Sequence, residues 1–257
     1  MKIRIVTGTG TGVGKTIVTA ALAAVAAAAG QQVAVVKPVQ TGLAPEAPDS
    51  DIAEVARLSG VTECHELVRL PDPLSPEAAA RAAGLPPVDM TGILRWITEA
   101  ARTADLLLVE GAGGLLVRFD DQGRTIADLA KSLRADVVVV ADPALGTLNH
   151  TALTLEALHR RRLRLAGVVL GSWPTVPDLA CRQNLIDLPT IIGGSLAGAL
   201  PAGAARLDRQ AFLRAARAGL GPGLGGEFNG TITVAPGSTP EPTPDPTPAG
   251  QPTPGDT

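Results

Sequence analysis

The 257-residue chain contains no tyrosine, two tryptophans and three phenylalanines. Proteins that bind single-stranded nucleic acid stack the bases on aromatic side chains, so this scarcity weighs against that class of function. The formal net charge is only −3, and segment 219–257 carries acidic residues but no lysine or arginine. The remainder is therefore nearly neutral, which argues against binding to DNA or to an acidic membrane surface.

Cysteine and long apolar runs are also scarce. The two cysteines, Cys64 and Cys181, lack the spacing of metal ligands and are expected to be small buried residues in a reducing compartment. No apolar stretch approaches the roughly 20 residues that span a membrane, and the first residues lack the layout of a signal peptide. We therefore expect a cytoplasmic protein.

Lysine is rare as well. Among the 22 basic residues, the lysines are Lys2, Lys15, Lys37 and Lys131. In a chain that otherwise uses arginine, a lysine can indicate a position that requires a compact positive charge.

Short runs rich in valine and leucine recur along the chain, namely KIRIV, QVAVVKPV, DLLLVEG, ADVVVVADP and LAGVVLGS. Because they lack clean alternation, they predict strands buried on both faces. Helical patterns lie between them, at residues 15–29, about 89–103, 147–161 and about 206–218. The alternation predicts an α/β fold with a doubly wound, mostly parallel sheet, whose ligands bind at the carboxyl ends of the strands.

The composition changes near residue 219. Proline stands at nearly every second position of GSTPEPTPDPTPAGQPTPGDT, and such a segment cannot bury enough apolar surface to become ordered. The sequence therefore predicts one domain over residues 1–220 and a low-complexity, disordered tail over 221–257. Only TITV, residues 231–234, could pair as a strand, so ending the chain near residue 226 is expected to cost little stability.

The segment IVTGTGTGVGKT joins the first strand to the first helix. Its glycines expose successive backbone N–H groups, and the helix N-terminus completes a concave site for an anion. In such a P-loop the lysine, here Lys15, reaches the β- and γ-phosphates, while the hydroxyl of Thr16 binds Mg²⁺. Gly8 precedes Gly14 by six positions rather than five, so this P-loop is one residue longer than usual.

P-loops serve many functions, and two classes lack support here. Regulatory GTPases read guanine with Asn-Lys-x-Asp, which the sequence does not contain. Partition and cell-division ATPases usually carry a second lysine five residues before the P-loop lysine, where this chain has Gly10.

Three further segments follow predicted strands. Lys37 ends a strand before Pro38, and Glu110 ends another in LVEGAGGLL, where an acid can reach the metal of a bound nucleotide. Residues 142–151, DPALGTLNHT, begin a helix whose free N–H groups suit a carboxylate. Taken alone, a surface lysine, a solvated acid and an ordinary helix cap also explain these segments.

Taken together, VTGTGTGVGKT, KPVQTG, VEGAGG, LGTLNHT and ALPAGAA resemble the dethiobiotin synthetases over residues 1 to about 220. The longer P-loop is characteristic of that family. VEGAGG and the P-loop also occur in related amidoligases, but the cobyrinate-type enzymes need a glutaminase domain with a nucleophilic cysteine. This chain has neither the length nor a suitable cysteine for such a domain.

The resemblance implies an ATP-dependent cyclo-ligase of biotin biosynthesis. Its substrate is 7,8-diaminopelargonic acid (7,8-diaminononanoate), one amine of which takes up CO₂ as a carbamate. ATP phosphorylates the carbamate to a carbamic-phosphoric anhydride, and the second amine then closes the ureido ring with release of ADP and phosphate. No protein nucleophile is required, so such an enzyme works by positioning and charge neutralisation. The alternative is a P-loop nucleotide switch or amidoligase-like protein whose tail binds a partner.

The resemblance also implies the residues of the site. Lys15 and Lys37 are expected where the γ-phosphate meets the carbamate. The implied magnesium ligands are Thr16, Asp51 and Glu110, with Asp51 favoured over Asp49 because it directly precedes the helix IAEV. The residues implied to bind the nucleotide phosphates and metal are Gly12, Val13, Gly14, Lys15, Thr16, Ile17, Asp51, Glu110, Gly111, Ala112 and Gly113. The residues implied to bind the substrate are Thr41 and, from the other subunit of a homodimer, Leu145, Gly146, Leu148 and Asn149.

The end of LAGVVLGSW departs from the family pattern. Many members read adenine there with an asparagine, whereas this chain has Gly171 and Ser172. Base recognition is therefore expected to fall to backbone groups, and other nucleoside triphosphates, CTP included, are expected to replace ATP. The residues expected around the base are Gly171, Ser172, Pro201, Ala202 and Gly203. The PDPLSP segment at 71–76 fits the family's proline-rich loop, but Glu77 replaces the usual histidine, so no role is assigned to it.

Overall fold

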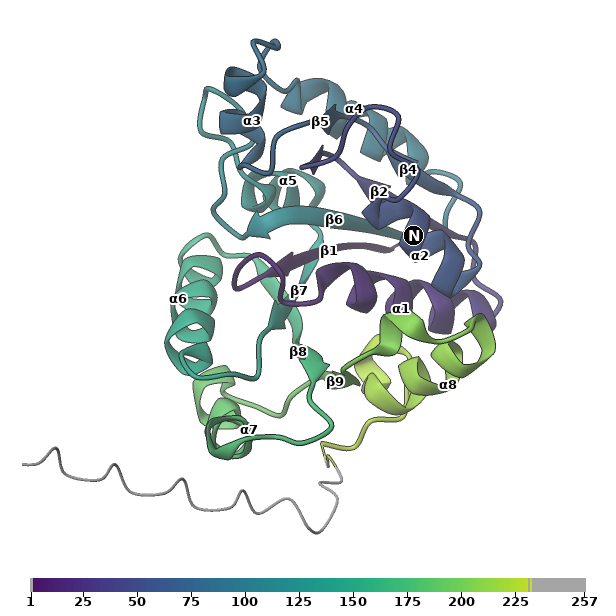
Figure 1. Cartoon of the computed structure of the whole chain (residues 1–257), viewed down its shortest axis with the longest axis vertical. Helices are drawn as coiled ribbons and strands as arrows, with labels where there is room; N and C mark the ends of the chain where they lie inside the picture. The colour runs from purple at the N-terminus through teal and green to yellow at the C-terminus, as the bar shows by residue number, and fades with distance from the viewer. Residues whose placement is uncertain (1, 231, 233–257) are drawn as a thin grey trace, which may run out of the picture.

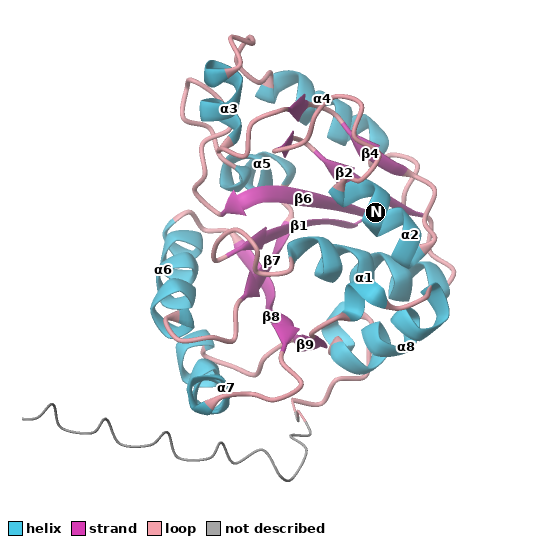
Figure 2. Ribbon diagram, viewed as in Figure 1, coloured by secondary structure: helices cyan, strands magenta, loops and turns pink. Residues whose placement is uncertain are grey.

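The computed structural model describes residues 2–230 and 232, which form a twisted sheet with helices on both faces (Figure 1). The sheet has seven strands in the order β4-β2-β6-β1-β7-β8-β9, and every neighbouring pair is parallel. Figure 2 shows β1 and β6 running side by side in the same direction. The predicted doubly wound α/β fold is confirmed.

The strands of the main sheet are β1 (Lys2–Gly8), β2 (Val33–Lys37), β4 (Cys64–Glu66), β6 (Leu106–Gly114), β7 (Asp136–Ala141), β8 (Arg164–Trp173) and β9 (Gly198–Pro201). A second, two-stranded sheet pairs β3 (Gln40–Thr41) with β5 (Arg69–Leu70). The α-helices are α1 (Lys15–Ala28), α2 (Asp51–Ser59), α3 (Pro76–Ala82), α4 (Met90–Ala100), α5 (Ile126–Leu133), α6 (Thr147–Arg160), α7 (Leu179–Ile192) and α8 (Arg209–Gly219). Two single-turn 3₁₀ helices are η1 (Ala204–Arg206) and η2 (Pro222–Leu224).

The central strands are apolar throughout because both of their faces are covered. Ile5 of β1 belongs to the core shared with α4 and α5, whereas its neighbour Val6 belongs to the core shared with α1, α2 and α8. Both side chains are fully buried. This two-sided burial explains why the valine-rich runs show no alternation. Within the described residues, no helix is long and apolar enough to cross a bilayer.

Helix α1 lies deep because most of its residues are small or apolar, with seven alanines and two valines among fourteen residues. Ten of its fourteen residues are buried, since small side chains let the sheet, α2 and α8 approach it closely (Figure 1). A helix that is apolar nearly all round is stable only in such a position. The core thus fixes the direction in which the N-terminus of α1 points.

The parallel order brings several loops to one edge of the sheet. The loop after β1, the end of β2 and the end of β6 are neighbours there, because these three strands are adjacent. The segments that follow β7, β8 and β9 continue along the same edge. In open α/β sheets this carboxyl edge is where ligands bind.

The C-terminal segment packs against the body beyond the predicted boundary. The Gly221 amide donates to the Ala197 carbonyl at 2.8 Å, and the Phe228 amide donates to the Leu220 carbonyl at 2.8 Å. Phe228 is buried. Ile232 is partly buried against the same core. We therefore propose that the folded body extends to Ile232 rather than ending at residue 220. Most of the predicted tail, residues 231 and 233–257, lies outside the described residues.

Candidate active site

The loop between β1 and α1 is shaped for an anion. Gly12 and Gly14 have φ of 78° and 95°, in the left-handed region that favours glycine. Gly14 is the N-cap of α1, and no side chain caps the first N–H groups of that helix. These free donors, with the positive end of the helix dipole, form a cradle for phosphate.

Lys15 lies inside this loop. The side chain is buried, and its Nζ donates to the Gly10 carbonyl at 2.8 Å. Burial, and after it the nearby charge of Lys37, lowers the pKa of Lys15 to about 8. The P-loop lysine is therefore an easily deprotonated group beside the phosphate cradle.

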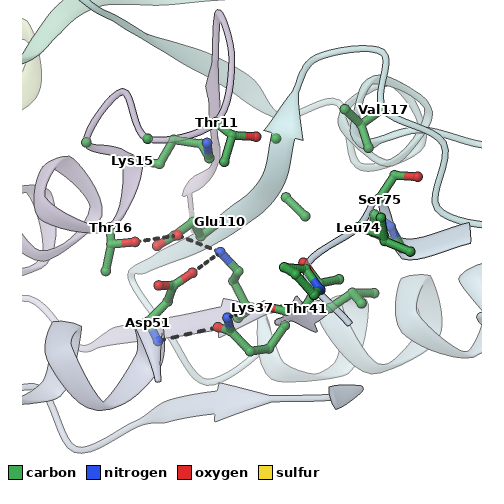
Figure 3. A pocket seen from close by; sticks show the side chains of 18 of the residues that line it. Thr11, Lys15, Thr16, Lys37, Thr41, Asp51, Leu74, Ser75, Glu110 and Val117 are labelled. Carbon is green, nitrogen blue, oxygen red and sulfur yellow. Dashed lines mark hydrogen bonds and ion pairs between the residues drawn. The ribbon is translucent and has the colours of Figure 1, made fainter. Parts of the chain in front are cut away.

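Lys37, Asp51, Glu110 and Thr16 form one polar network (Figure 3). Lys37 Nζ donates to Glu110 Oε1 at 2.7 Å and to Asp51 Oδ2, and Thr16 Oγ1 donates to the same Glu110 oxygen at 2.9 Å. Burial by itself lowers the pKa of Lys37, but the Glu110 and Asp51 carboxylates outweigh it and the pKa is raised. Lys37 is thus a charged ammonium with almost no exposure to water.

The network also has the character of a magnesium site. Glu110 is fully buried, and its Oε2 has no hydrogen-bond partner among the described residues. Two carboxylates and one hydroxyl converge, and Mg²⁺ prefers such oxygen ligands together with phosphate and water. Within the described part of the chain, no group of three or more His, Cys, Asp or Glu side chains could hold a metal. A metal here would therefore depend on Thr16 and on the nucleotide.

Asp51 reaches the network because of the helix that it begins. Ser50 caps α2 by accepting a hydrogen bond from the Ala53 amide at 3.2 Å, and Asp51 is the first residue of that helix. The Gln40 side chain accepts from the Asp51 amide at 3.4 Å. Asp49 lines an adjoining cavity instead. The structure thus brings Asp51, rather than Asp49, to Lys37 and Glu110.

A cavity of about 760 Å³ joins these groups. Its lining includes Thr41, Ala112, Gly113 and Ile17, which the sequence predicted. Other lining residues had no predicted role, namely Thr11, Val39, Gln40, Pro73, Leu74, Ser75, Pro76 and Val117. Leu74, Ser75 and Val117 stand on the side opposite the phosphate cradle (Figure 3). The proline-rich PDPLSP segment was the available signal for part of this wall.

The predicted base site is built around a close backbone contact. A Cβ placed on Gly171 would lie 1.9 Å from the Val13 carbonyl oxygen, and one on Gly14 would lie 2.7 Å from the Gly171 oxygen. The end of β8 and the P-loop therefore touch without any side chain between them. Ser172 is exposed, and the Ala202 amide donates to the Trp173 carbonyl at 2.7 Å, which brings the Pro201–Gly203 turn alongside.

The predicted carboxylate site lies apart from this cavity within one chain. Gly146, with φ of 97°, precedes α6, and no side chain caps that helix. Leu145 is 87% exposed, and Asn149 is exposed as well. Asn184 of α7 holds the preceding loop, since its Nδ2 donates to the Pro143 and Ala144 carbonyls at 2.9 and 3.0 Å. None of the four predicted residues, Leu145, Gly146, Leu148 and Asn149, lines the main cavity.

Several curated relatives that match this chain carry the same enzyme name. The family model described as an AAA domain matches residues 4–205. The chain is 58% identical over 229 residues to ATP-dependent dethiobiotin synthetase BioD of Frankia casuarinae, covering 89% of this chain and 95% of the relative. It is 56% identical over 229 residues to ATP-dependent dethiobiotin synthetase BioD of Saccharopolyspora erythraea, covering 89% and 100%.

Among solved structures, the chain resembles the septum site-determining protein MinD of Pyrococcus horikoshii OT3, determined with Mg-ADP. The TM-score is 0.50 at 18% identity, over 84% of this chain and 94% of the other. At that identity the likeness shows a shared P-loop fold alone.

Proposed function

The chain belongs to the dethiobiotin synthetase family, and from this premise we propose how its residues carry out the reaction. The protein is an ATP-dependent ligase of biotin biosynthesis that forms dethiobiotin from 7,8-diaminopelargonic acid. The assignment of roles rests on one observation. The P-loop, Lys37, Asp51 and Glu110 line the same cavity.

The proposed reaction joins CO₂ to one substrate amine as a carbamate. The carbamate oxygen attacks the γ-phosphorus of ATP, ADP leaves, and the carbamic-phosphoric anhydride forms. The second amine then attacks the carbonyl carbon, phosphate leaves, and the ureido ring closes. Both partners of the phosphoryl transfer are anions, so positive charge at their meeting point lowers the barrier most directly.

Two lysines supply that charge. Lys15 and Lys37 approach the cavity from different elements, the P-loop and the end of β2. We assign Lys15 to the β- and γ-phosphates, because it stands in the phosphate cradle. We assign Lys37 to the carbamate, together with Thr41 and the 110–113 segment, because Lys37, Thr41, Glu110, Ala112 and Gly113 line the cavity next to the cradle.

The nucleotide would lie along the P-loop. The phosphates would accept hydrogen bonds from the backbone of Gly12, Val13, Gly14, Lys15, Thr16 and Ile17. Thr16, Asp51 and Glu110 would hold Mg²⁺, which supplies charge neutralisation of the triphosphate. The base would lie near Gly171, Ser172 and the Pro201–Gly203 turn, where backbone groups are the available hydrogen-bond donors and acceptors.

We propose that the substrate carboxylate is bound by a second copy of the chain. Leu145, just before α6, and Leu153, on α6, are 87% and 56% exposed. Large exposed apolar side chains of this kind are typical of an interface. A homodimer that covers them would bring Leu145–Asn149, with the Leu148 and Asn149 N–H groups in the first turn of α6, over the open end of the partner's cavity.

We also propose a cytoplasmic location, because the co-substrate ATP is supplied there. Cys64 and Cys181 are free thiols, which agrees with a reducing compartment.

The proposed function is tested with the purified full chain. Incubation with ATP, Mg²⁺, bicarbonate and diaminopelargonate should yield dethiobiotin, detected by mass spectrometry, and one phosphate per product. Omission of diaminopelargonate should reduce phosphate release to background. If phosphate release does not depend on diaminopelargonate and no dethiobiotin forms, the protein would instead be a nucleotide switch.

A further inference from the structure

The Lys37 ammonium has a hydrogen-bond acceptor for each of its protons. Nζ contacts Asp51 Oδ2, Glu110 Oε1 at 2.7 Å and, more weakly, the Gly111 carbonyl at 3.4 Å. No proton of the ammonium is thus left for an anion in the cavity. The arrangement described is therefore not the one in which Lys37 could contact a carbamate.

The same two carboxylates are proposed magnesium ligands, and Glu110 Oε2 has no hydrogen-bond partner among the described residues. Glu110 Oε1 accepts from both Lys37 and Thr16, and Asp51 Oδ2 accepts from Lys37. A divalent cation bound to these carboxylates would stand within a few ångströms of the ammonium, where like charges repel strongly in a buried setting. The site therefore has room for one of the two cations at a time.

The charge of the site changes when one cation replaces the other. Lys15 and Lys37 balance Asp51 and Glu110 in the structure described, so the four side chains sum to zero. Addition of Mg²⁺ would leave an excess of two positive charges. That excess would be offset by the triphosphate, and the displaced ammonium would face a second anion.

We propose that Lys37 is an internal place-holder for the metal, and that arrival of the metal–nucleotide releases its ammonium from Asp51 and Glu110 into the cavity. This inference rests on the proposed function for the identity of the metal ligands. Lys37 already lines the cavity, so rotation about its terminal bonds suffices for the change. The catalytic lysine would thus become available only after the nucleotide is in place, and the carbamate would bind second.

The test is metal binding in the absence of nucleotide, measured by Mn²⁺ electron paramagnetic resonance on the full chain. In the wild type Mn²⁺ must displace Lys37, whereas in Lys37→Met the two carboxylates are free. We expect Lys37→Met to bind Mn²⁺ at least ten times more tightly than the wild type. Lys15→Met removes an equal charge from the same cavity but no contact with the carboxylates, so its gain should be clearly smaller.

Thermal melting provides a second readout. Without Lys37 the carboxylates repel each other, so Lys37→Met should melt below the wild type, and Mn²⁺ should raise its melting temperature more than that of the wild type. Equal or weaker Mn²⁺ binding by a folded Lys37→Met would overturn the place-holder role while leaving the ligase assignment intact. Equal gains in Lys37→Met and Lys15→Met would also overturn it. Failure of both proteins to bind Mn²⁺, even with nucleotide, would overturn the ligand set itself.

Discussion

Lys37 is the residue on which the proposed chemistry depends most directly. Lys37→Ala removes a charge from the point where two anions meet, so kcat should fall by a factor of about 100 to 1,000. Steady-state dethiobiotin formation measures this, and circular dichroism checks the fold. Lys131→Ala, at an exposed position of α5, is the matched control and should keep full activity. Near-normal turnover by a folded Lys37→Ala protein would remove Lys37 from the mechanism.

The lowered pKa of Lys15 predicts that nucleotide binding depends on pH. Its pKa is lowered to about 8 in the free protein by burial and then by Lys37, and a bound triphosphate favours the charged form, so the pKa rises on binding. At a pH between the pKa of Lys15 in the free protein and its pKa in the complex, nucleotide binding takes up a proton. Affinity for the nucleotide therefore falls as the pH rises above about 8. Below about pH 7 the lysine is charged in both states and takes up nothing.

Calorimetry in two buffers of different ionisation enthalpy, at about pH 7 and pH 8.5, measures the proton uptake. The uptake should appear at the higher pH and be absent from Lys15→Met. If Lys15→Met takes up the same number of protons, another group is responsible.

Some of the site could be predicted from single residues, and some could not. Lys37 ends β2, Glu110 lies in β6, and Lys15 and Thr16 begin α1 after the loop that follows β1. Because β2, β6 and β1 are adjacent and parallel, these residues meet at one edge of the sheet. The resemblance favours Asp51 over Asp49 because Asp51 directly precedes the helix IAEV. In the structure α2 begins at Asp51, which contacts Lys37. Ser75 and Leu74 reach the cavity through the β3–β5 pairing, and two-residue strands leave no periodic signal.

The contact between β8 and the P-loop bears on nucleotide choice. Gly171 has no side chain, so no side-chain amide at this position can hydrogen-bond to the adenine edge. Loss of such a bidentate contact removes ~1–3 kcal/mol of discrimination between bases. The values of kcat/KM for ATP, GTP, CTP and UTP should therefore fall within about a hundredfold of one another under the same Mg²⁺. A larger preference for ATP would mean that backbone atoms read adenine as well as an asparagine does.

Introducing the missing amide should not repair the selectivity. In Gly171→Asn the new Cβ would have to lie 1.9 Å from the Val13 oxygen, so the P-loop must move and nucleotide affinity should fall for all bases. Gly194→Asn, at an exposed position where a Cβ would meet nothing within 4 Å, is the matched control and should bind nucleotide as the wild type does. A gain of ATP preference in Gly171→Asn at full affinity would contradict the close contact.

Element length decided which helices the sequence revealed. The fourteen-residue helices α1 and α6 were predicted to within a residue or two, because several turns show their period. Helix α5 has eight residues and was not predicted, although Thr125 and Asp128 form a capping box at its start. Helix α7 carries Pro189 in its interior, which reads as a break in the pattern. Strand β9, with four residues, is too short to stand out.

The C-terminal boundary can be located by truncation. Ending the chain after residue 234 keeps Phe228 and Ile232, both of which pack on the core, whereas ending it after residue 226 removes them. Full burial of one large apolar side chain contributes about 1.5–3 kcal/mol, so the chain that ends after residue 226 should be less stable by about that amount in denaturant titrations. This replaces the expectation from the sequence alone that ending the chain near residue 226 costs little stability. The chain that ends after residue 234 should match the full chain in stability and activity. Loss of activity in the chain that ends after residue 234 would show that the residues beyond it have a role.

The proposed homodimer can be broken without touching the nucleotide site. Leu153→Asp places a charge on the exposed face of α6, so the protein should become monomeric by light scattering. The KM for diaminopelargonate should rise at least tenfold while nucleotide affinity stays unchanged, because only the carboxylate site would come from the partner. Leu85→Asp, at another exposed leucine (45%, against 56% for Leu153), is the control and should leave the oligomer intact. An active Leu153→Asp monomer would show that one chain suffices.

The close approach of Gly14 and Gly171 has a consequence for how the enzyme can change over time. A side chain at Gly14 would meet the backbone of Gly171, and one at Gly171 would meet the backbone of Val13, so neither position can acquire a side chain while the other loop keeps its shape. A lineage that acquires an asparagine at 171 must also alter the loop that contains Gly14, and the two changes must be inherited together. Transplanting the β8 end from an adenine-selective relative would thus fail alone and succeed only with that relative's P-loop.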